Sequence, residues 1–149
     1  MLQLKLKQLQ NESDTWKQLL GFMMEENINL RDRLSELLKD KFDTNLLEEV
    51  EGFQTSFLKK DDLIGILRND VAELDKLLKQ EIFEDKKINN DIDRRMTKLH
   101  DNIITAEIQL SNLKLTFNNY LLRINTGNKI QGKLINGVGI ALQQYPKHF

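Results

Sequence analysis

The side chains in this sequence best suited to acid–base or metal chemistry are its two histidines, His100 and His148. A carboxylate-bridged dimetal site in a helical bundle needs Glu-x-x-His pairs, but Thr97 occupies the Glu position of such a motif before His100. The chain has no cysteine, which excludes disulfides, thiol catalysis and thiolate metal ligands. We therefore expect no metal site and no cofactor.

The sequence also lacks the glycine-containing motifs of common enzyme classes. It contains no nucleophile elbow, no phosphate-cradling glycine loop and no dinucleotide-binding fingerprint. The aromatic residues Trp16, Phe53 and Phe57 fall at helical spacing, which favours packing in a core over a stacking platform for a ligand. These observations predict a protein that is not an enzyme.

The segment around His100 offers one chemical alternative. Residues 94–104 have the sequence RRMTKLHDNII. This segment resembles the phosphoacceptor helix of one histidine-kinase subgroup, in which a Leu-His-Asp triplet lies on a helix of a dimeric bundle. The resemblance implies that His100 would be phosphorylated and that Asp101 would be its acidic neighbour. Too few residues follow for the ATP-binding domain, so it implies at most a phosphotransfer relay; the other interpretation is a solvent-facing histidine.

His100 lies within residues 92–124, which carry an unbroken heptad pattern. Apolar residues follow one another at alternating steps of three and four, the spacing that keeps one face of a helix against partner helices. They are Ile92, Met96, Leu99, Ile103, Ala106, Leu110, Leu113, Phe117, Tyr120 and Ile124. We expect a helix over about residues 90–123 that ends before Asn125-Thr126-Gly127.

The same helix has a second apolar stripe, formed by Ile104, Ile108, Leu115 and Leu122. These residues lie about 150° from the heptad seam at roughly 100° per residue. A helix that is apolar on two sides must be covered on two sides. The C-terminal segment, a second copy of the chain or a different protein would supply the cover, unless the two faces simply contact the two other helices. We predict that this second apolar stripe is an interaction face.

Two further helices are predicted before this one. Heptad spacing extends over residues 2–41, although Asn11, Ser13 and Asp14 offer an alternative N-cap at which the helix would begin later. A second heptad pattern extends over residues 45–83, and the polar segments at 40–44 and 84–91 predict the two chain reversals.

Several residues in these patterns have two interpretations. Asn27 falls on the first seam, where a buried Asn would fix the register between helices; alternatively it lies at the seam's edge and Ile28 takes the buried space. Gly52 and Gly65, within the second helix, either permit close approach of another helix or mark a bend.

Charge and hydropathy exclude other classes of protein. The 22 basic and 23 acidic residues give a net charge of −1, and basic pairs such as Lys59-Lys60 have acidic neighbours. A nucleic-acid partner is therefore not expected. The N-terminal residues lack an uninterrupted apolar run, and no run is long enough to cross a membrane, so we expect a cytoplasmic protein without a signal peptide or a membrane span.

The sequence predicts an all-α fold. Proline breaks helices, and the one proline in the chain is Pro146, so nothing of this kind interrupts the heptad patterns that precede it. Residues 1–125 would form an elongated antiparallel bundle of about three long, coiled-coil-like helices, with a long two-helix hairpin as the competing architecture. Residues 126–149 would form a glycine-containing tail or a β-hairpin turning at Asn136-Gly137. The function we expect is that of a non-catalytic protein-interaction or scaffold protein that associates with itself, with phosphotransfer through His100 as the alternative.

Overall fold

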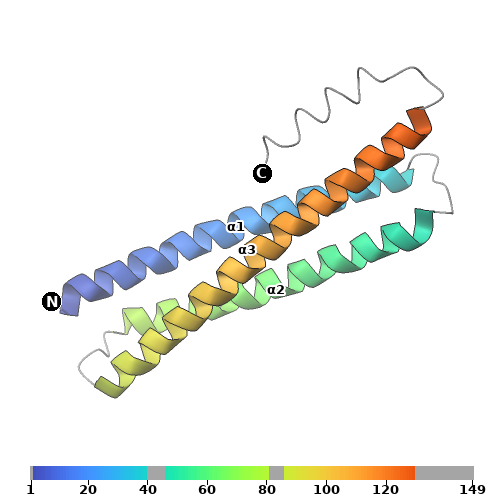
Figure 1. Ribbon diagram of the computed structural model, residues 1–149. Helices are drawn as coiled ribbons and strands as arrows, with labels where there is room; N and C mark the ends of the chain where they lie inside the picture. Colours follow the sequence, from blue (N-terminus) through green and yellow to red (C-terminus); the bar gives the residue numbers. More distant parts are fainter. Residues whose placement is uncertain (1, 40–45, 81–85, 130–149) are drawn as a thin grey trace. The chain divides into compact units, whose positions relative to one another are not determined.

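Three long α-helices make up the part of the chain described by the computed structural model, residues 2–39, 46–80 and 86–129 (Figure 1). They are α1 (Leu2–Lys39), α2 (Leu47–Lys79) and α3 (Lys86–Lys129), and no strand occurs in these residues. The helices pack against one another, which confirms the predicted all-α bundle of three helices. The proposed β-hairpin falls in residues 130–149, outside the described residues, and stays a prediction.

The first two helices begin and end close to their predicted limits. α1 is continuous from Leu2, so the alternative start near Asn11 is wrong. α2 ends at Lys79, earlier than the predicted limit of residue 83. The backbone N–H of Gln80 donates to the carbonyls of Lys76, at 3.2 Å, and Leu77, at 3.3 Å, and so caps the helix.

The limits of α3 differ from the prediction at both ends. The helix extends from Lys86 to Lys129, whereas the sequence predicted about 90–123 with a stop at Asn125-Thr126-Gly127. Asn, Thr and Gly each lower helix stability by at most about 1 kcal/mol relative to Ala, and no proline is present to break the backbone hydrogen bonds. A run of weak helix formers therefore does not end this helix.

The chain divides into two compact units, residues 1–108 and residues 109–149. The first contains α1, α2 and the N-terminal part of α3, and the second contains the rest of α3. The predicted division between a bundle at 1–125 and a tail at 126–149 stays a prediction.

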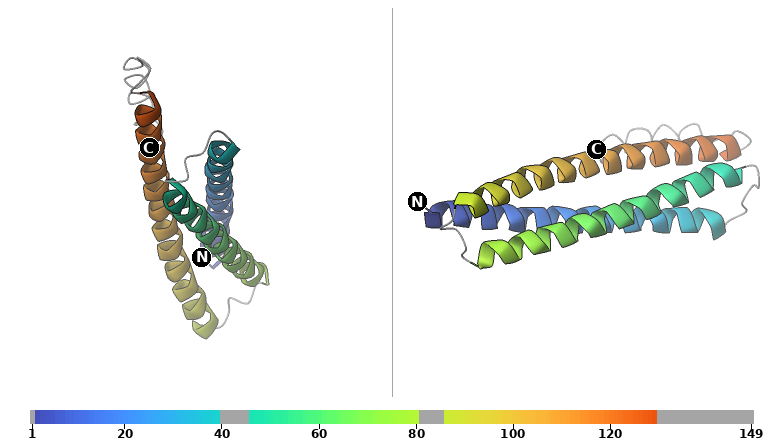
Figure 2. Two further views of the ribbon diagram at one scale, coloured as in Figure 1. Left: turned by 90° about the vertical axis from the view of Figure 1, so that its right-hand side faces the viewer. Right: turned by 90° about the horizontal axis from the view of Figure 1, so that it is seen from below.

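Within the first unit, α1 and α2 lie side by side and run in opposite directions (Figures 1 and 2). Lys17 pairs with Asp75 and Arg31 pairs with Asp61, and the order of these ion pairs along the two helices confirms the antiparallel arrangement. The N-terminal part of α3 runs parallel to α1, because Asp93 pairs with Lys5 and His100 contacts Trp16.

The buried apolar side chains of the first unit fall on the heptad spacing of its helices. In α1 they include Trp16, Leu20, Met23, Leu30 and Leu34; in α2, Val50, Phe57, Ile64, Leu67, Val71, Leu74 and Leu78; and in α3, Ile92, Met96, Leu99, Ile103 and Ala106. In the second unit, Leu110, Phe117 and Tyr120 are buried as well. The heptad spacing therefore identified the core directly.

Candidate functional site

The second apolar stripe lies largely in solvent. Ile104 and Ile108, in the first unit, keep 40% and 55% of their surface exposed. In the second unit, Leu115 keeps 45% and Leu122 is half-buried. All four lie on α3, where eight of the ten seam positions are buried. Three of the four predicted face residues therefore present apolar surface that the described part of the chain does not cover, while their role in binding stays a prediction.

His100 lies on α3 with its side chain 48% exposed. Its Nδ1 atom is 3.5 Å from Oδ1 of Asp101, and its ring centre is 6.4 Å from that of Trp16, with the ring planes tilted by 46°. An Nδ1–H directed at the carboxylate would leave the Nε2 lone pair for chemistry. The arrangement is compatible with phosphorylation, which stays a prediction, and equally with an indole contact that orients an exposed imidazole.

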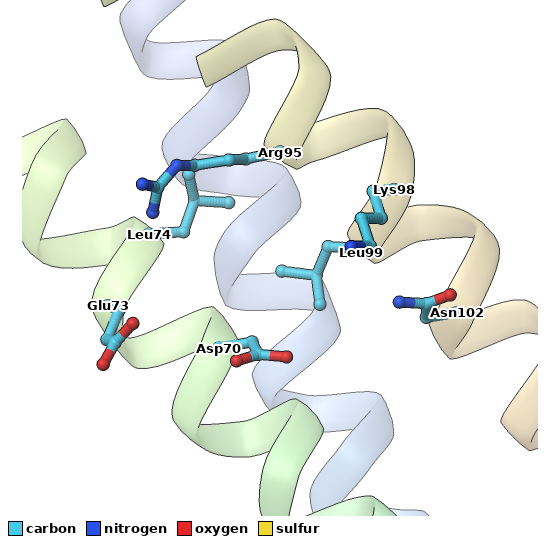
Figure 3. A pocket seen from close by; sticks show the side chains of 7 residues that line it. All are labelled: Asp70, Glu73, Leu74, Arg95, Lys98, Leu99 and Asn102. Atoms are coloured by element: carbon cyan, nitrogen blue, oxygen red, sulfur yellow. The ribbon is translucent and has the colours of Figure 1, made fainter. Parts of the chain in front are cut away.

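A shallow groove of about 190 Å³ lies between α2 and α3 in the first unit (Figure 3). Its α2 side carries Asp70 and Glu73, and its α3 side carries Arg95 and Lys98. The remaining lining residues are Leu74, Leu99 and Asn102. The two sides of the groove thus have opposite charge, and its lining contains no histidine, cysteine or hydroxyl nucleophile.

The sequence did not single out this groove. Its charged residues are ordinary solvent-facing positions on two helices that lie far apart in the chain, and only the pairing of those helices brings them together. Arg95 also forms an ion pair within α3, with its Nε atom 3.2 Å from Oδ2 of Asp91. Because Asp91 already holds this guanidinium, the groove is better explained as the surface between two packed helices than as a ligand site.

Polar groups also enter the helix interface. Asn27 is fully buried, whereas Ile28 keeps 42% of its surface exposed, so the interpretation in which Ile28 takes the buried space is wrong. The Nδ2 group of Asn27 donates to the carbonyl oxygen of Phe57, at 2.9 Å, and to Oδ1 of Asp61, at 2.6 Å. Arg31 donates to the other oxygen of the same carboxylate. We call Asn27, Arg31 and Asp61 the Asn27 cluster.

A second polar cluster surrounds Asp75 of α2. Its Oδ2 atom is 3.0 Å from Nζ of Lys17 and 2.9 Å from Nζ of Lys79. Burial acts to raise the pKa of Asp75, but hydrogen bonds and charge attraction from Lys79 and Lys17 outweigh it and hold the pKa below its usual value. The same carboxylate raises the pKa of Lys79. This cluster keeps a buried charge neutralised.

Comparison with known protein families, curated proteins and solved structures found no match. Across the described parts of the three helices, no three His, Asp or Glu side chains come together in a way that could hold a metal ion. None of these helices has a segment of the length and apolar character needed to cross a bilayer.

Proposed function

We propose that this protein is a non-catalytic helical interaction or scaffold protein, and that it associates with a second copy of itself through the second apolar stripe. The observation that carries the proposal is the exposure of Ile104 and Ile108 on a helix whose opposite seam is buried. Contiguous apolar surface of this kind is uncommon on isolated chains and marks association sites.

A second copy of the chain is a suitable partner because its second apolar stripe is exposed in the same way, so each stripe would bury the other. Full burial of an Ile or Leu side chain is worth about 1.5–3 kcal/mol, so covering a half-exposed one contributes roughly 1 kcal/mol. Four such residues from each copy must offset the loss of translational and rotational freedom, which costs about 4–15 kcal/mol. The balance predicts weak association that depends on concentration.

Light scattering during size-exclusion chromatography tests the proposal. We expect the mass of the wild-type chain to rise from monomer toward dimer as the loading concentration increases. Ile108→Lys should abolish that rise, because it would place an ammonium group inside the contact. Thr105→Lys is the matched control, since Thr105 is exposed on the same turn of α3 and lies outside the stripe.

The outcomes separate cleanly. A wild-type chain that stays monomeric at millimolar concentration would remove the proposed function. A dimer that forms equally well in Ile108→Lys and Leu115→Lys would show that association uses another surface. A dimer lost in Thr105→Lys as well as Ile108→Lys would show that added charge, rather than the stripe, decides the result.

A further inference from the structure

The Asn27 cluster lies in the contact between α1 and α2, with apolar side chains on the neighbouring turns of α1. Leu20, Met23, Leu30 and Leu34 are buried on the neighbouring turns of α1. Asn27 is as deeply buried as they are, yet it carries an amide that needs partners. α2 supplies two of them, a main-chain carbonyl at Phe57 and the carboxylate of Asp61.

Each member of the cluster depends on the others being at the same level along the helices. The carboxylate of Asp61 receives Asn27 on one oxygen and Arg31 on the other, so both oxygens are used by α1. Asn27 and Arg31 are one helical turn apart, which places them above one another on the same face. Moving α1 along α2 by a single turn, about 5.4 Å, would take the short Asn27 side chain out of reach of Asp61 and of the Phe57 carbonyl.

The apolar contacts alone do not determine which turns of α1 and α2 meet. Both seams repeat every seven residues, so sliding one helix past the other by seven residues again places apolar residues opposite apolar residues. In such a shifted arrangement Asn27 and Arg31 would face Gln54 or Arg68 in place of Asp61, so neither would have a carboxylate to donate to. Losing the hydrogen bonds that this carboxylate accepts disfavours the shifted register by roughly tenfold to a hundredfold in population.

The other cross-helix ion pair discriminates less well. Lys17 keeps 43% of its side chain exposed, and its long flexible stem can follow Asp75 through small shifts. Asn27, in contrast, has a short side chain that is fixed in the core. We propose that the Asn27 cluster sets the register in which α1 pairs with α2.

The chain has no cysteine, so two can be introduced as the only spin-labelling sites. Gln18 on α1 and Gln54 on α2 are exposed, and they lie at different levels along the antiparallel pair. We would replace both by cysteine, as Gln18→Cys and Gln54→Cys, and attach a spin label to each. The distance between their labels, measured by pulsed electron spin resonance, therefore changes when one helix slides along the other. A slide of seven residues moves the labels by about 10 Å along the axis.

We expect one distance in the chain with native Asn27 and at least one further, displaced distance after Asn27→Leu, which removes the polar requirement but keeps an apolar seam. Asn29→Leu is the matched control, because Asn29 is exposed on the same helix and should leave one distance. If Asn27→Leu unfolds because Asp61 is left without its partner, the double variant Asn27→Leu/Asp61→Leu removes both groups and should fold with several distances.

The inference is overturned if either folded variant shows the single native distance. It is also overturned if the double variant fails to fold while Asn29→Leu folds normally, because the cluster would then be required for folding rather than for the choice between registers. Neither outcome depends on self-association, since dilution below the dimer range leaves the distance within one chain unchanged.

Discussion

Asp75 places a buried carboxylate at the α1–α2 interface, and its stabilising contribution depends on its charge. Two ammonium groups, from Lys17 and Lys79, hold that charge in the folded chain. The pKa of Asp75 is therefore lower in the folded chain than in the unfolded chain. A group with a depressed folded pKa contributes stability above its unfolded pKa and loses that contribution as the pH falls through its folded pKa.

This linkage predicts a pH-dependent difference between the wild type and Asp75→Asn. The free energy of unfolding should be lower in the variant by about 1.5–3 kcal/mol near neutral pH, the range for hydrogen bonds to a charged group. The difference should begin to shrink as the pH falls below about 4, the unfolded value for Asp, and continue to shrink through the lower folded pKa. Urea denaturation across this pH range measures it.

Asp62→Asn is the control for this prediction, because Asp62 is exposed on the same helix. It should match the wild type at neutral pH to within about 0.5 kcal/mol, as ordinary surface substitutions do. A gap between the wild type and Asp75→Asn that stays constant down to about pH 2 would contradict the role of the charge.

Which of two neighbouring side chains is buried in α1 could not be predicted from the sequence. Heptad spacing placed Asn27 on the seam but could not choose between it and Ile28, because hydrophobicity favours burying the isoleucine. The choice depends on acceptors from α2, at Phe57 and Asp61, and these come from a part of the chain that the local pattern does not include. A polar residue in a seam can be interpreted only when the facing helix is known.

Helix limits show the same dependence at the scale of one element. Helix propensity and the absence of proline correctly predicted that α1 is one continuous helix. It failed at the C-terminal end of α3, where Asn125-Thr126-Gly127 looked like a stop but the helix extends to Lys129. Propensity differences of about 1 kcal/mol per residue are small beside the cooperativity of a helix more than forty residues long.

Glycines inside α2 give a testable consequence at this scale. The sequence left open whether Gly52 and Gly65 allow close approach of another helix. Among the described residues, a Cβ atom built on either glycine meets nothing within 4 Å beyond its own stretch of helix, so close packing does not require a glycine at either position. We expect Gly52→Ala and Gly65→Ala each to raise the free energy of unfolding by about 0.5–1 kcal/mol.

Urea denaturation of the two variants measures this gain. Ala72→Gly is the converse control, since Ala72 is exposed on the same helix and should lose a similar amount. A loss of stability in Gly65→Ala would mean that a side chain at this position meets an obstruction in solution, and it would return the close-approach interpretation.

For the whole molecule, a repeat in the sequence was sufficient to predict three helices and their buried faces. It was not sufficient to predict which flanks meet. The groove between α2 and α3 is lined by Asp70 and Glu73 on one side and by Arg95 and Lys98 on the other. Neither pair has a sequence pattern that predicts a groove. Heptad positions predict which side chains are buried inside a bundle. The neighbours of the residues beside the seam can be predicted only when it is known which helices pack together.

Self-association through the second apolar stripe would also change the stability of the whole molecule. A partner that binds only the folded chain stabilises it by mass action, so the melting temperature should rise with protein concentration. About 1 kcal/mol of added stability corresponds to roughly 2–4 °C in a chain of this size, which predicts a rise of a few degrees. Ile108→Lys should melt at one temperature throughout, because it can no longer dimerise. Calorimetry over a hundredfold range of concentration makes the comparison, and a wild-type melting temperature that does not depend on concentration would contradict the proposed association even if the variant behaves as expected.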